Sequence, residues 1–213
     1  MTSGRPSVRR LQLIDESNRH AHSNIFEEDR CYFLREYTAK VGGWRYGETN
    51  DLIDNFQKSP KFRGKPPWER YKQQAIARLA DELRAAFSPS QCVGLTFVPT
   101  PPSKMKGDPE HDDRILRLLA RFSQGVNLDI RELVLQTAST ETSKSLGGAR
   151  WTWDQLAANY VINEDECVPE PGRVMVVDDV LTTGSHFRAM KRIIQRRFDS
   201  VSVEGLFLAR TVY

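Results

Sequence analysis

Apolar residues recur at helical spacing in three long stretches of the chain. They stand three or four positions apart, so each stretch has one apolar stripe and an opposite charged face, which predicts amphipathic helices. The stripe residues are Ile76, Leu79, Leu83 and Phe87 within residues 68–87, then Ile115, Leu118 or Leu119 and Phe122, then Phe187, Met190, Ile194 and Phe198. A shorter helix is expected to end at Phe56, with Thr49 or Asn50 as its N-cap.

Short apolar and aromatic runs between these helices predict strands. Runs of this kind suit strands that are buried in a parallel sheet. The expected strands cover residues 31–38 (a strand or a hairpin arm), 92–98, 130–135, 160–162, 173–177 and 201–208. From residue 68 onward, helices and strands alternate along the chain. This order predicts an α/β fold with an open parallel sheet and crossover helices.

Composition narrows the class of protein. The chain has 213 residues, a net charge of +3 and the apolar content of an ordinary globular domain. Such a small positive charge does not indicate nucleic-acid binding. No apolar run approaches the length that a membrane span needs, and the first ten residues lack the apolar core of a signal peptide. The widely spaced Cys31, Cys92 and Cys167 favour neither a zinc site nor a disulfide framework. We therefore expect a cytoplasmic protein.

The segment from Arg173 to His186 carries the strongest chemical signal. Its apolar strand runs into two adjacent carboxylates, Asp178 and Asp179, and then into a Thr-Thr-Gly-Ser turn before the last helix. Ligands of open α/β sheets bind beyond the carboxyl ends of the strands. Gly184 permits a close backbone approach, so the turn amides can form an anion-binding nest at the helix N-terminus. Carboxylates beside a phosphate cradle suit a sugar phosphate.

This segment resembles the phosphoribosyl-pyrophosphate (PRPP) motif of type I phosphoribosyltransferases, in which an apolar strand leads into an acidic pair and a Thr-x-Gly-Ser/Thr loop. The resemblance implies a type I phosphoribosyltransferase-like open parallel sheet with flanking helices. It implies that Asp178 and Asp179 lie by the ribose 2′- and 3′-hydroxyls as the catalytic pair, with an indirect role toward a metal. The residues that it implies for the 5′-phosphate are Thr182, Thr183, Gly184 and Ser185. The alternative is a plain strand–helix junction with an acidic strand end.

Residues 98–107 form a second informative loop. Its prolines stiffen the backbone, and its hydroxyl and lysine side chains supply donors and positive charge that suit a polyanion. The Val-Pro-x-Pro start resembles the pyrophosphate loop of phosphoribosyltransferases, in particular the amidophosphoribosyltransferase-like branch that includes the competence protein F group. The residues implied for pyrophosphate are Thr100, Pro101, Ser103, Lys104 and Lys106. The alternative is a Pro-rich surface turn with ordinary lysines.

Two features of that branch are absent. The chain lacks an N-terminal Cys-x-x-Cys zinc ribbon, and the basic segment after the loop is replaced by the acidic Asp108–Arg114. One hypothesis is that Mg²⁺, which prefers carboxylate and phosphate oxygens, is held between these acids and the diphosphate. The other, which we favour, is that Asp112 and Asp113 cap the following helix, where negative charge in the first turn is favourable.

A polar stretch over residues 136–150 predicts a lid. Long polar loops in compact domains are usually functional or disordered, and type I phosphoribosyltransferases close a flexible loop over the reacting centre at about this place. Closure would exclude water from an electrophilic sugar carbon. The lid residues predicted to act are Ser143, Lys144 and Arg150. The alternative is a flexible connection without function.

The resemblance covers residues 68–213, the core domain. Residues 1–67 match nothing specific and are predicted to be an N-terminal arm or hood, for a base or a partner protein. His20 and His22 have a spacing that could serve a metal, but exposed polar side chains are the simpler interpretation. The basic face of the last helix, which includes Arg192, Arg196 and Arg197, is interpreted as a solvated surface rather than an RNA-binding patch.

The sequence therefore predicts binding of PRPP and Mg²⁺, and transfer of ribose 5-phosphate to an unidentified nitrogen acceptor with release of pyrophosphate. A rival hypothesis is a non-catalytic PRPP or nucleotide sensor that regulates a partner. A third is a nucleic-acid adaptor built on the basic helix. Neither a homodimer nor a protein partner is excluded by the pattern. No Walker loop and no Gly-x-Gly-x-x-Gly motif occurs.

Overall fold

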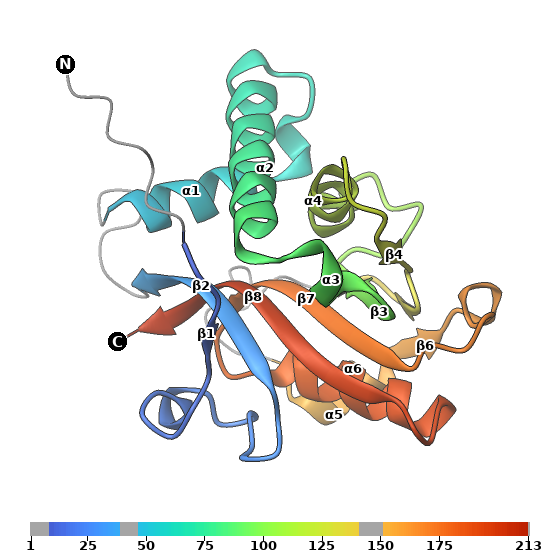
Figure 1. Ribbon diagram of the computed structural model, residues 1–213. Coiled ribbons are helices and arrows are strands. Elements are labelled where there is room, and N and C mark those ends of the chain that lie inside the picture. Colours follow the sequence, from blue (N-terminus) through green and yellow to red (C-terminus); the bar gives the residue numbers. More distant parts are fainter. Residues whose placement is uncertain (1–8, 39–46, 141–150, 213) are drawn as a thin grey trace.

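The computed structural model describes residues 9–38, 47–140 and 151–212, and its centre is a six-stranded sheet (Figure 1). The strand order is β1-β2-β8-β7-β3-β4. Only the β1–β2 pair among these neighbours is antiparallel; the other pairs are parallel. The strands are β1 (Gln12–Leu13), β2 (Cys31–Thr38), β3 (Leu95–Pro99), β4 (Asp129–Ile130), β7 (Arg173–Leu181) and β8 (Ser202–Val212). The predicted α/β class with a mostly parallel sheet is confirmed.

Helices cover both faces of this sheet (Figure 1). One face carries α1 (Glu48–Phe56), α2 (Pro66–Ala86), the short α3 (Pro89–Cys92) and α4 (Arg114–Phe122). The other carries α5 (Trp153–Ala158) and α6 (Ser185–Arg197). A separate antiparallel pair joins β5 (Val134–Gln136) to β6 (Tyr160–Ile162). The described residues also include the 3-10 turns η1 (Arg19–Ala21), η3 (Pro60–Phe62) and η4 (Glu164–Glu166). Within the described ranges, no helix has both the length and the apolar content needed to cross a membrane.

The central strand β7 supplies both hydrophobic cores. Val174 and Val176 pack in the core under α5 and α6, whereas Met175 and Val177 pack in the core under α1, α2 and α4. Successive side chains of a strand point to opposite faces, so a continuous apolar run is needed in a strand that is covered on both sides. The predicted apolar stripes of α2, α4 and α6 are buried as expected.

Several predicted element boundaries are wrong. The strand expected over 130–135 is two strands, because β4 pairs with β3 whereas β5 pairs with β6. β3 starts only at Leu95, since α3 and its Ser88 capping box occupy the preceding residues. The N-cap of α1 is Gly47 rather than Thr49 or Asn50. The Asn50 side chain is instead engaged with the backbone of Thr38 (2.9 Å from Nδ2 to the carbonyl oxygen).

Part of the predicted N-terminal arm belongs to the main sheet. β2 lies between β1 and β8 and runs parallel to β8, with Cys31 opposite Gly205. Cys31, Phe33 and Leu34 of this strand are buried in the two cores. Residues 1–67, predicted to be an arm or hood apart from the core domain, thus contribute β1 and β2 to the main sheet, and the aromatic run correctly predicted a strand at β2.

Candidate functional site

The two loops singled out in the sequence lie side by side at the carboxyl edge of the sheet. β3 and β7 are parallel neighbours, and their last paired residues are Pro99 and Val177. Directly beyond that pair, the Thr100 amide donates to the Val177 carbonyl over 2.9 Å. The loop after β3 therefore starts against the residue that precedes Asp178. This edge is where open parallel sheets bind ligands.

The two adjacent aspartates have different surroundings. β7 continues to Leu181, so Asp178 and Asp179 lie inside the strand rather than after it, at the point where only β8 still accompanies them. Strand alternation directs their side chains to opposite faces of the sheet. Asp179 faces α1 and α4, and Asp178 faces the side of α6. The expectation that both carboxylates jointly hold one pair of hydroxyls does not fit this alternation.

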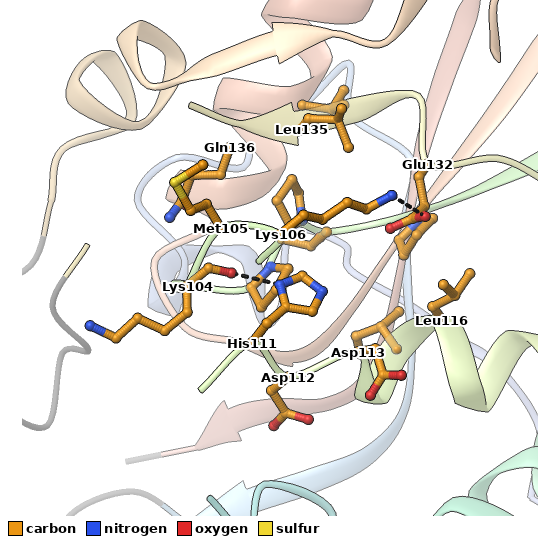
Figure 2. A pocket seen from close by; sticks show the side chains of 16 residues that line it. Lys104, Met105, Lys106, His111, Asp112, Asp113, Leu116, Glu132, Leu135 and Gln136 are labelled. Atoms are coloured by element: carbon orange, nitrogen blue, oxygen red, sulfur yellow. Dashed lines mark hydrogen bonds and ion pairs between the residues drawn. The ribbon is translucent and has the colours of Figure 1, made fainter. Parts of the chain in front are cut away.

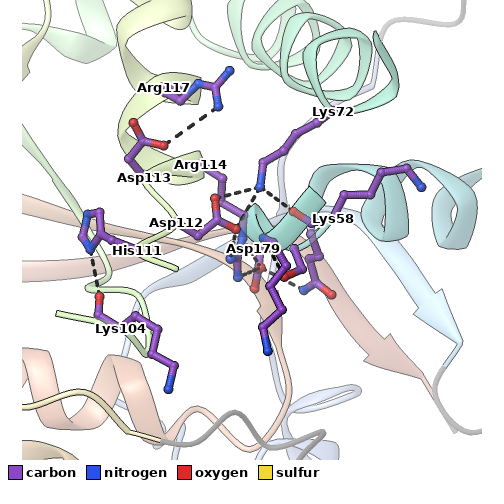
Figure 3. A network of polar contacts seen from close by, with 12 residues as sticks. Lys58, Lys72, Lys104, His111, Asp112, Asp113, Arg114, Arg117 and Asp179 are labelled. Carbon is purple, nitrogen blue, oxygen red and sulfur yellow. Dashed lines mark hydrogen bonds and ion pairs between the residues drawn. The ribbon is translucent and has the colours of Figure 1, made fainter. Parts of the chain in front are cut away.

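Asp179 is the buried end of a charge network (Figure 3). Its Oδ2 accepts from Arg114 (2.6 Å to Nη2) and from Gln57 (2.8 Å). Burial disfavours the ionised form, but the charge of Arg114 and these hydrogen bonds outweigh it and hold the pKa of Asp179 below its ordinary value. Arg114 also binds Asp112 (2.7 Å), and Asp112 binds the buried Lys72 (2.7 Å). The network joins β7 to α1, α2 and α4.

Asp178 has no such cation. Its Oδ1 accepts the backbone amide of Asp179 over 2.8 Å, and no described Lys or Arg side chain forms an ion pair with it. Burial raises the pKa of Asp178 to about 8, and the charge of Asp179 acts in the same direction. The buried Tyr160 is near enough for the Asp178 charge to add to the effect of burial in raising its pKa. The Tyr160 hydroxyl lies 2.8 Å from Nδ1 of His186 in the first turn of α6.

The turn after β7 has the geometry of an anion cradle. Gly184 is the N-cap of α6 and takes the left-handed conformation, with φ +85° and ψ +11°. The hydroxyls of Thr183 and Ser185 lie 2.9 Å apart. Among the described residues, the backbone amides of Thr183, Gly184 and Ser185 donate to no acceptor. These amides and the N-terminal end of the α6 dipole favour a bound anion.

An N-terminal strap, residues 22–29, holds this turn in place. The Asn24 amide donates to the Thr183 carbonyl (2.8 Å), and its side chain donates to the Ser185 hydroxyl (3.0 Å). A ring nitrogen of His22 contacts the Thr182 carbonyl. A Cβ on Gly184 would meet Ile25 Cδ1 at 2.7 Å, so a larger residue there would have to displace the Ile25 side chain of the strap. His22 is thus a buried structural residue, and its predicted exposure is wrong; His20 is exposed as predicted.

The loop after β3 is braced by its neighbours. The Ser103 carbonyl accepts from the Thr140 amide (2.7 Å) and from Gln136 Nε2 (2.7 Å). Pro101 is buried beside Thr100. The Lys106 ammonium group pairs with Glu132 (2.6 Å), whereas the Lys104 side chain extends away from that pair (Figure 2). Of the two predicted pyrophosphate lysines, Lys104 is the one whose charge is not matched by a described carboxylate.

The two aspartates of the acidic segment after this loop have different positions. The Asp112 carboxylate lies in the Lys72–Arg114 network, and Asp113 is the N-cap of α4 by position but makes no side-chain capping bond. The capping prediction is therefore wrong for Asp112, whereas Asp113 stands at the N-cap position. No group of three or more metal-ligating side chains converges among the described residues. The predicted lid residues Ser143, Lys144 and Arg150 lie outside the described residues.

The sequence did not point to Arg114, Gln57 or Asn24 as parts of this site. For Arg114 the sequence did contain one indication. A cation in the first turn of a helix opposes the helix dipole, which suggests a specific acidic partner. The other two are ordinary polar residues whose contacts arise only from tertiary packing. The positive side chains of α6 are largely matched by acids: Arg188 and Lys191 contact the buried Asp29, and further pairs are Arg192–Asp154 and Arg197–Glu164.

No protein-family model matches the chain, and no curated protein matches it. The functional argument therefore depends on the geometry at the carboxyl edge of the sheet. There a glycine turn, whose amides have no acceptor in the described part of the chain, opens α6 directly beyond a carboxylate that forms no ion pair with a described cation.

Proposed function

We propose that the protein binds PRPP at this edge of the sheet and transfers its ribose 5-phosphate to a nitrogen acceptor, with release of pyrophosphate. The observation that carries the proposal is the left-handed Gly184 turn, whose free amides lie between Asp178 in β7 and the N-terminus of α6. A phosphate monoester needs such a cradle, and the attached sugar needs a hydroxyl acceptor one sugar length away.

Each end of the substrate has a matching group. The 5′-phosphate would occupy the Thr182–Ser185 turn, with the hydroxyls of Thr183 and Ser185 as further donors. The ribose hydroxyls would face Asp178. The pyrophosphate would extend toward the loop after β3, which starts at the neighbouring strand end and offers Thr100, Ser103 and Lys104, while Lys106 would first have to leave Glu132.

Transfer of ribose 5-phosphate from PRPP requires that the protein position the substrate, and it requires no nucleophilic side chain. Departure of pyrophosphate leaves positive charge on the sugar carbon, as in glycoside hydrolysis, and a carboxylate near the ring stabilises it. Asp178 is placed for this task once binding has ionised it. Asp179, which already binds Arg114 and Gln57, would fix the end of β7 instead of touching the sugar.

Magnesium does not fit a site made by the described residues alone. The Asp179 carboxylate is already paired with Arg114, and Asp178 is a single carboxyl group whose pKa is raised. Mg²⁺ would therefore arrive with the diphosphate oxygens, which supply the hard ligands that it prefers. The proposed setting is the reducing cytoplasm; in support, Cys31, Cys92 and Cys167 are all free and buried.

The test is calorimetric titration of the protein with PRPP plus Mg²⁺, followed by an assay of released pyrophosphate with a panel of bases and amines. We expect PRPP to bind at least ten-fold more tightly than ribose 5-phosphate, and Asp178→Asn to reduce pyrophosphate release by at least 100-fold. Asp108→Asn, which alters a carboxylate on the loop surface, is the matched control and should keep wild-type turnover.

Two outcomes would change the assignment. Absence of PRPP binding would refute it. Tight PRPP binding that depends on the Gly184 turn, without pyrophosphate release with any acceptor, would favour the non-catalytic sensor, in which the ligand acts on a partner. The engagement of Asp179 by Arg114 is the specific observation that keeps this second candidate open, since it leaves one carboxylate for the sugar.

A further inference from the structure

Asn24 of the N-terminal strap contacts the anion cradle through two separate hydrogen bonds. Its backbone amide donates to the Thr183 carbonyl over 2.8 Å, and its side-chain Nδ2 donates to the Ser185 hydroxyl over 3.0 Å. Residues 24 and 185 are 161 positions apart, so tertiary packing alone brings them together. The backbone bond fixes where the strap lies, and the side-chain bond acts on a hydroxyl of the cradle.

A buried ion pair holds Asn24 in place. The Arg188 side chain of α6 donates to the Asn24 carbonyl (3.1 Å from Nη2) and contacts the Asp29 carboxylate, which is fully buried. Lys191 reaches the same carboxylate over 2.6 Å. The Arg188 guanidinium also lies 3.9 Å from the centre of the Phe26 ring. Because its support is already in place, the Asn24 side chain loses little conformational freedom when a ligand binds.

The Asn24 side chain sets the direction of hydrogen bonding in the cradle. The amide nitrogen of asparagine can only donate, so the Ser185 oxygen is the acceptor in their bond. The Ser185 hydroxyl also lies 2.9 Å from that of Thr183, and either can be the donor in that contact. The two hydroxyls have two hydrogens between them, and their mutual bond uses one. At least one O–H can therefore point to an oxygen of a ligand.

We infer that Asn24 is a positioning residue of the cradle, which orients the hydroxyls of Ser185 and Thr183 as donors to a phosphate dianion. The ionised oxygens of a phosphate ester accept hydrogen bonds, so a cradle made of donors fits them. Asn24 acts through Ser185 and need not touch the ligand. The inference rests on the proposed function, because it takes the 5′-phosphate of PRPP as the ligand of the cradle.

The Asn24→Asp substitution would reverse this direction. An ionised carboxylate accepts hydrogen bonds and cannot donate them, so the Ser185 O–H would turn toward residue 24 and away from the ligand. The carboxylate would also place a negative charge beside the phosphate, and like charges repel. The substitution keeps the size of the side chain and the backbone bond to Thr183. Its effect is therefore confined to hydrogen bonding and charge.

The experiment is calorimetric titration of the full chain with PRPP plus Mg²⁺, for the wild type and for Asn24→Asp, with urea unfolding of each protein. We expect Asn24→Asp to weaken PRPP binding by about 100-fold, since a bond to a charged group is lost and a repulsion is added. The matched control Ser23→Asp places the same charge on the exposed neighbouring residue. It should weaken binding by less than about three-fold, because water and salt screen an exposed charge.

A double-mutant cycle tests whether Asn24 acts through Ser185. Asn24→Leu removes the donor without adding charge and should weaken PRPP binding about ten-fold, as should Ser185→Ala. If Asn24 acts by orienting the Ser185 hydroxyl, Asn24→Leu should weaken binding no further in the Ser185→Ala background. A purely structural role for Asn24 predicts that the two losses add. The cycle also tests the inference if Asn24→Asp does not fold.

Three outcomes would overturn the inference. PRPP affinity unchanged in Asn24→Asp would show that the Asn24 amide presents its oxygen, not its nitrogen, to Ser185. An equal loss in Ser23→Asp would reduce the effect to added charge, and additive losses in the cycle would make Asn24 a structural residue. Each of these leaves the proposed function in place, because the wild type binds PRPP in all three. Failure of the wild type to bind PRPP would instead refute the proposed function, and the role of Asn24 with it.

Discussion

The two faces of β7 treat neighbouring carboxylates in opposite ways. On the face of α1 and α4, Asp179 is locked by Arg114 and Gln57 into a network that continues to Asp112 and Lys72 (Figure 3). On the face of α6, Asp178 forms no ion pair with a described cation but lies at the entrance of a turn whose amides have no described acceptor. Two identical residues in one strand thus have different roles: one stabilises the strand end, and the other remains available to a ligand.

The difference between Asp178 and Asp179 also indicates which side of β7 is less stable because it serves ligand binding. A half-buried carboxylate without an ion-pair partner is unfavourable when ionised, so its pKa is raised and the protonated form is favoured until something compensates the charge. Groups of this kind gather at functional sites. Perturbation of each face separately should therefore give distinct results: loss of folding stability on the Asp179 side, and loss of ligand binding on the Asp178 side.

The largest loss of folding stability is expected for Arg114→Met. This change leaves Asp179 buried with Gln57 but without a charge partner, and it removes one partner of Asp112. Breaking a buried ion pair from one side costs about 3–5 kcal/mol, so we expect a loss of that size in urea unfolding. Arg117→Met, one turn later in α4, is the matched control.

Among the described carboxylates, Arg117 reaches the half-exposed Asp113 alone, at 3.9 Å, and such surface pairs contribute about 0–1 kcal/mol. If Arg114→Met and Arg117→Met destabilised the protein equally, the Asp179 face would not be a stabilising network and the contrast between the two faces would be lost.

The second-largest loss of folding stability is expected for Gly184→Ala. The alanine must take a φ near +85° and place its Cβ 2.7 Å from Ile25 Cδ1. The backbone strain costs about 1–2 kcal/mol, and the contact with the strap adds to it, so we expect a loss of about 2–3 kcal/mol in thermal or urea unfolding. PRPP binding should weaken as well, because the turn amides move.

Gly64→Ala separates these two causes. Gly64 has a similar φ of +81°, but nothing lies within 4 Å of the position where its Cβ would be. It should therefore show the backbone cost alone, with PRPP binding unchanged. Equal losses in the two variants would show that Ile25 gives way and that the strap does not press on the cradle.

The sequence predicted the elements whose signal is local. The apolar run of β7, the stripes of α2, α4 and α6, and the glycine turn after β7 all depend on spacing within a few residues, and the structure has them. Boundaries were wrong where a tertiary partner decided them. The expected strand over 130–135 divides because its two ends pair with strands that are distant in the chain.

The site was predicted less completely for the same reason. Asp112 was predicted to be a helix cap because it precedes a helix. Its actual partner, Lys72, lies 40 positions earlier in the chain, and no pattern in the neighbouring sequence indicates that pair. The strap of residues 22–29 showed no periodicity, yet its Ile25 side chain lies where a Cβ on Gly184 would be. Adjacent carboxylates looked like one unit in the sequence, and only the continuation of β7 through them assigns the two to different faces.

The smallest effect is expected for Asp178→Asn. This substitution changes how the free energy of unfolding depends on pH, rather than its value at one pH. Asp178 has a raised pKa in the fold, so between about pH 4 and pH 8 it is protonated when folded and ionised when unfolded. Folding therefore takes up one proton at Asp178 in this pH range. As the pH rises through the range, the free energy of unfolding falls by at most about 1.4 kcal/mol per pH unit. Asp178→Asn has no such proton to bind, so its stability relative to the wild type should rise by about 1–2 kcal/mol from pH 5.5 to pH 7.

The control for this measurement is Asp108→Asn. Hydrogen bonds from Glu110 and Ser139 lower the pKa of Asp108, which is therefore ionised in both the folded and the unfolded chain above pH 5.5. Its relative stability should stay constant over the same range. A flat difference for Asp178→Asn too would mean that Asp178 is ionised in the folded protein, compensated as fully as Asp179. The two faces of β7 would then be electrostatically alike, and the carboxylate proposed to meet the sugar would have no special environment.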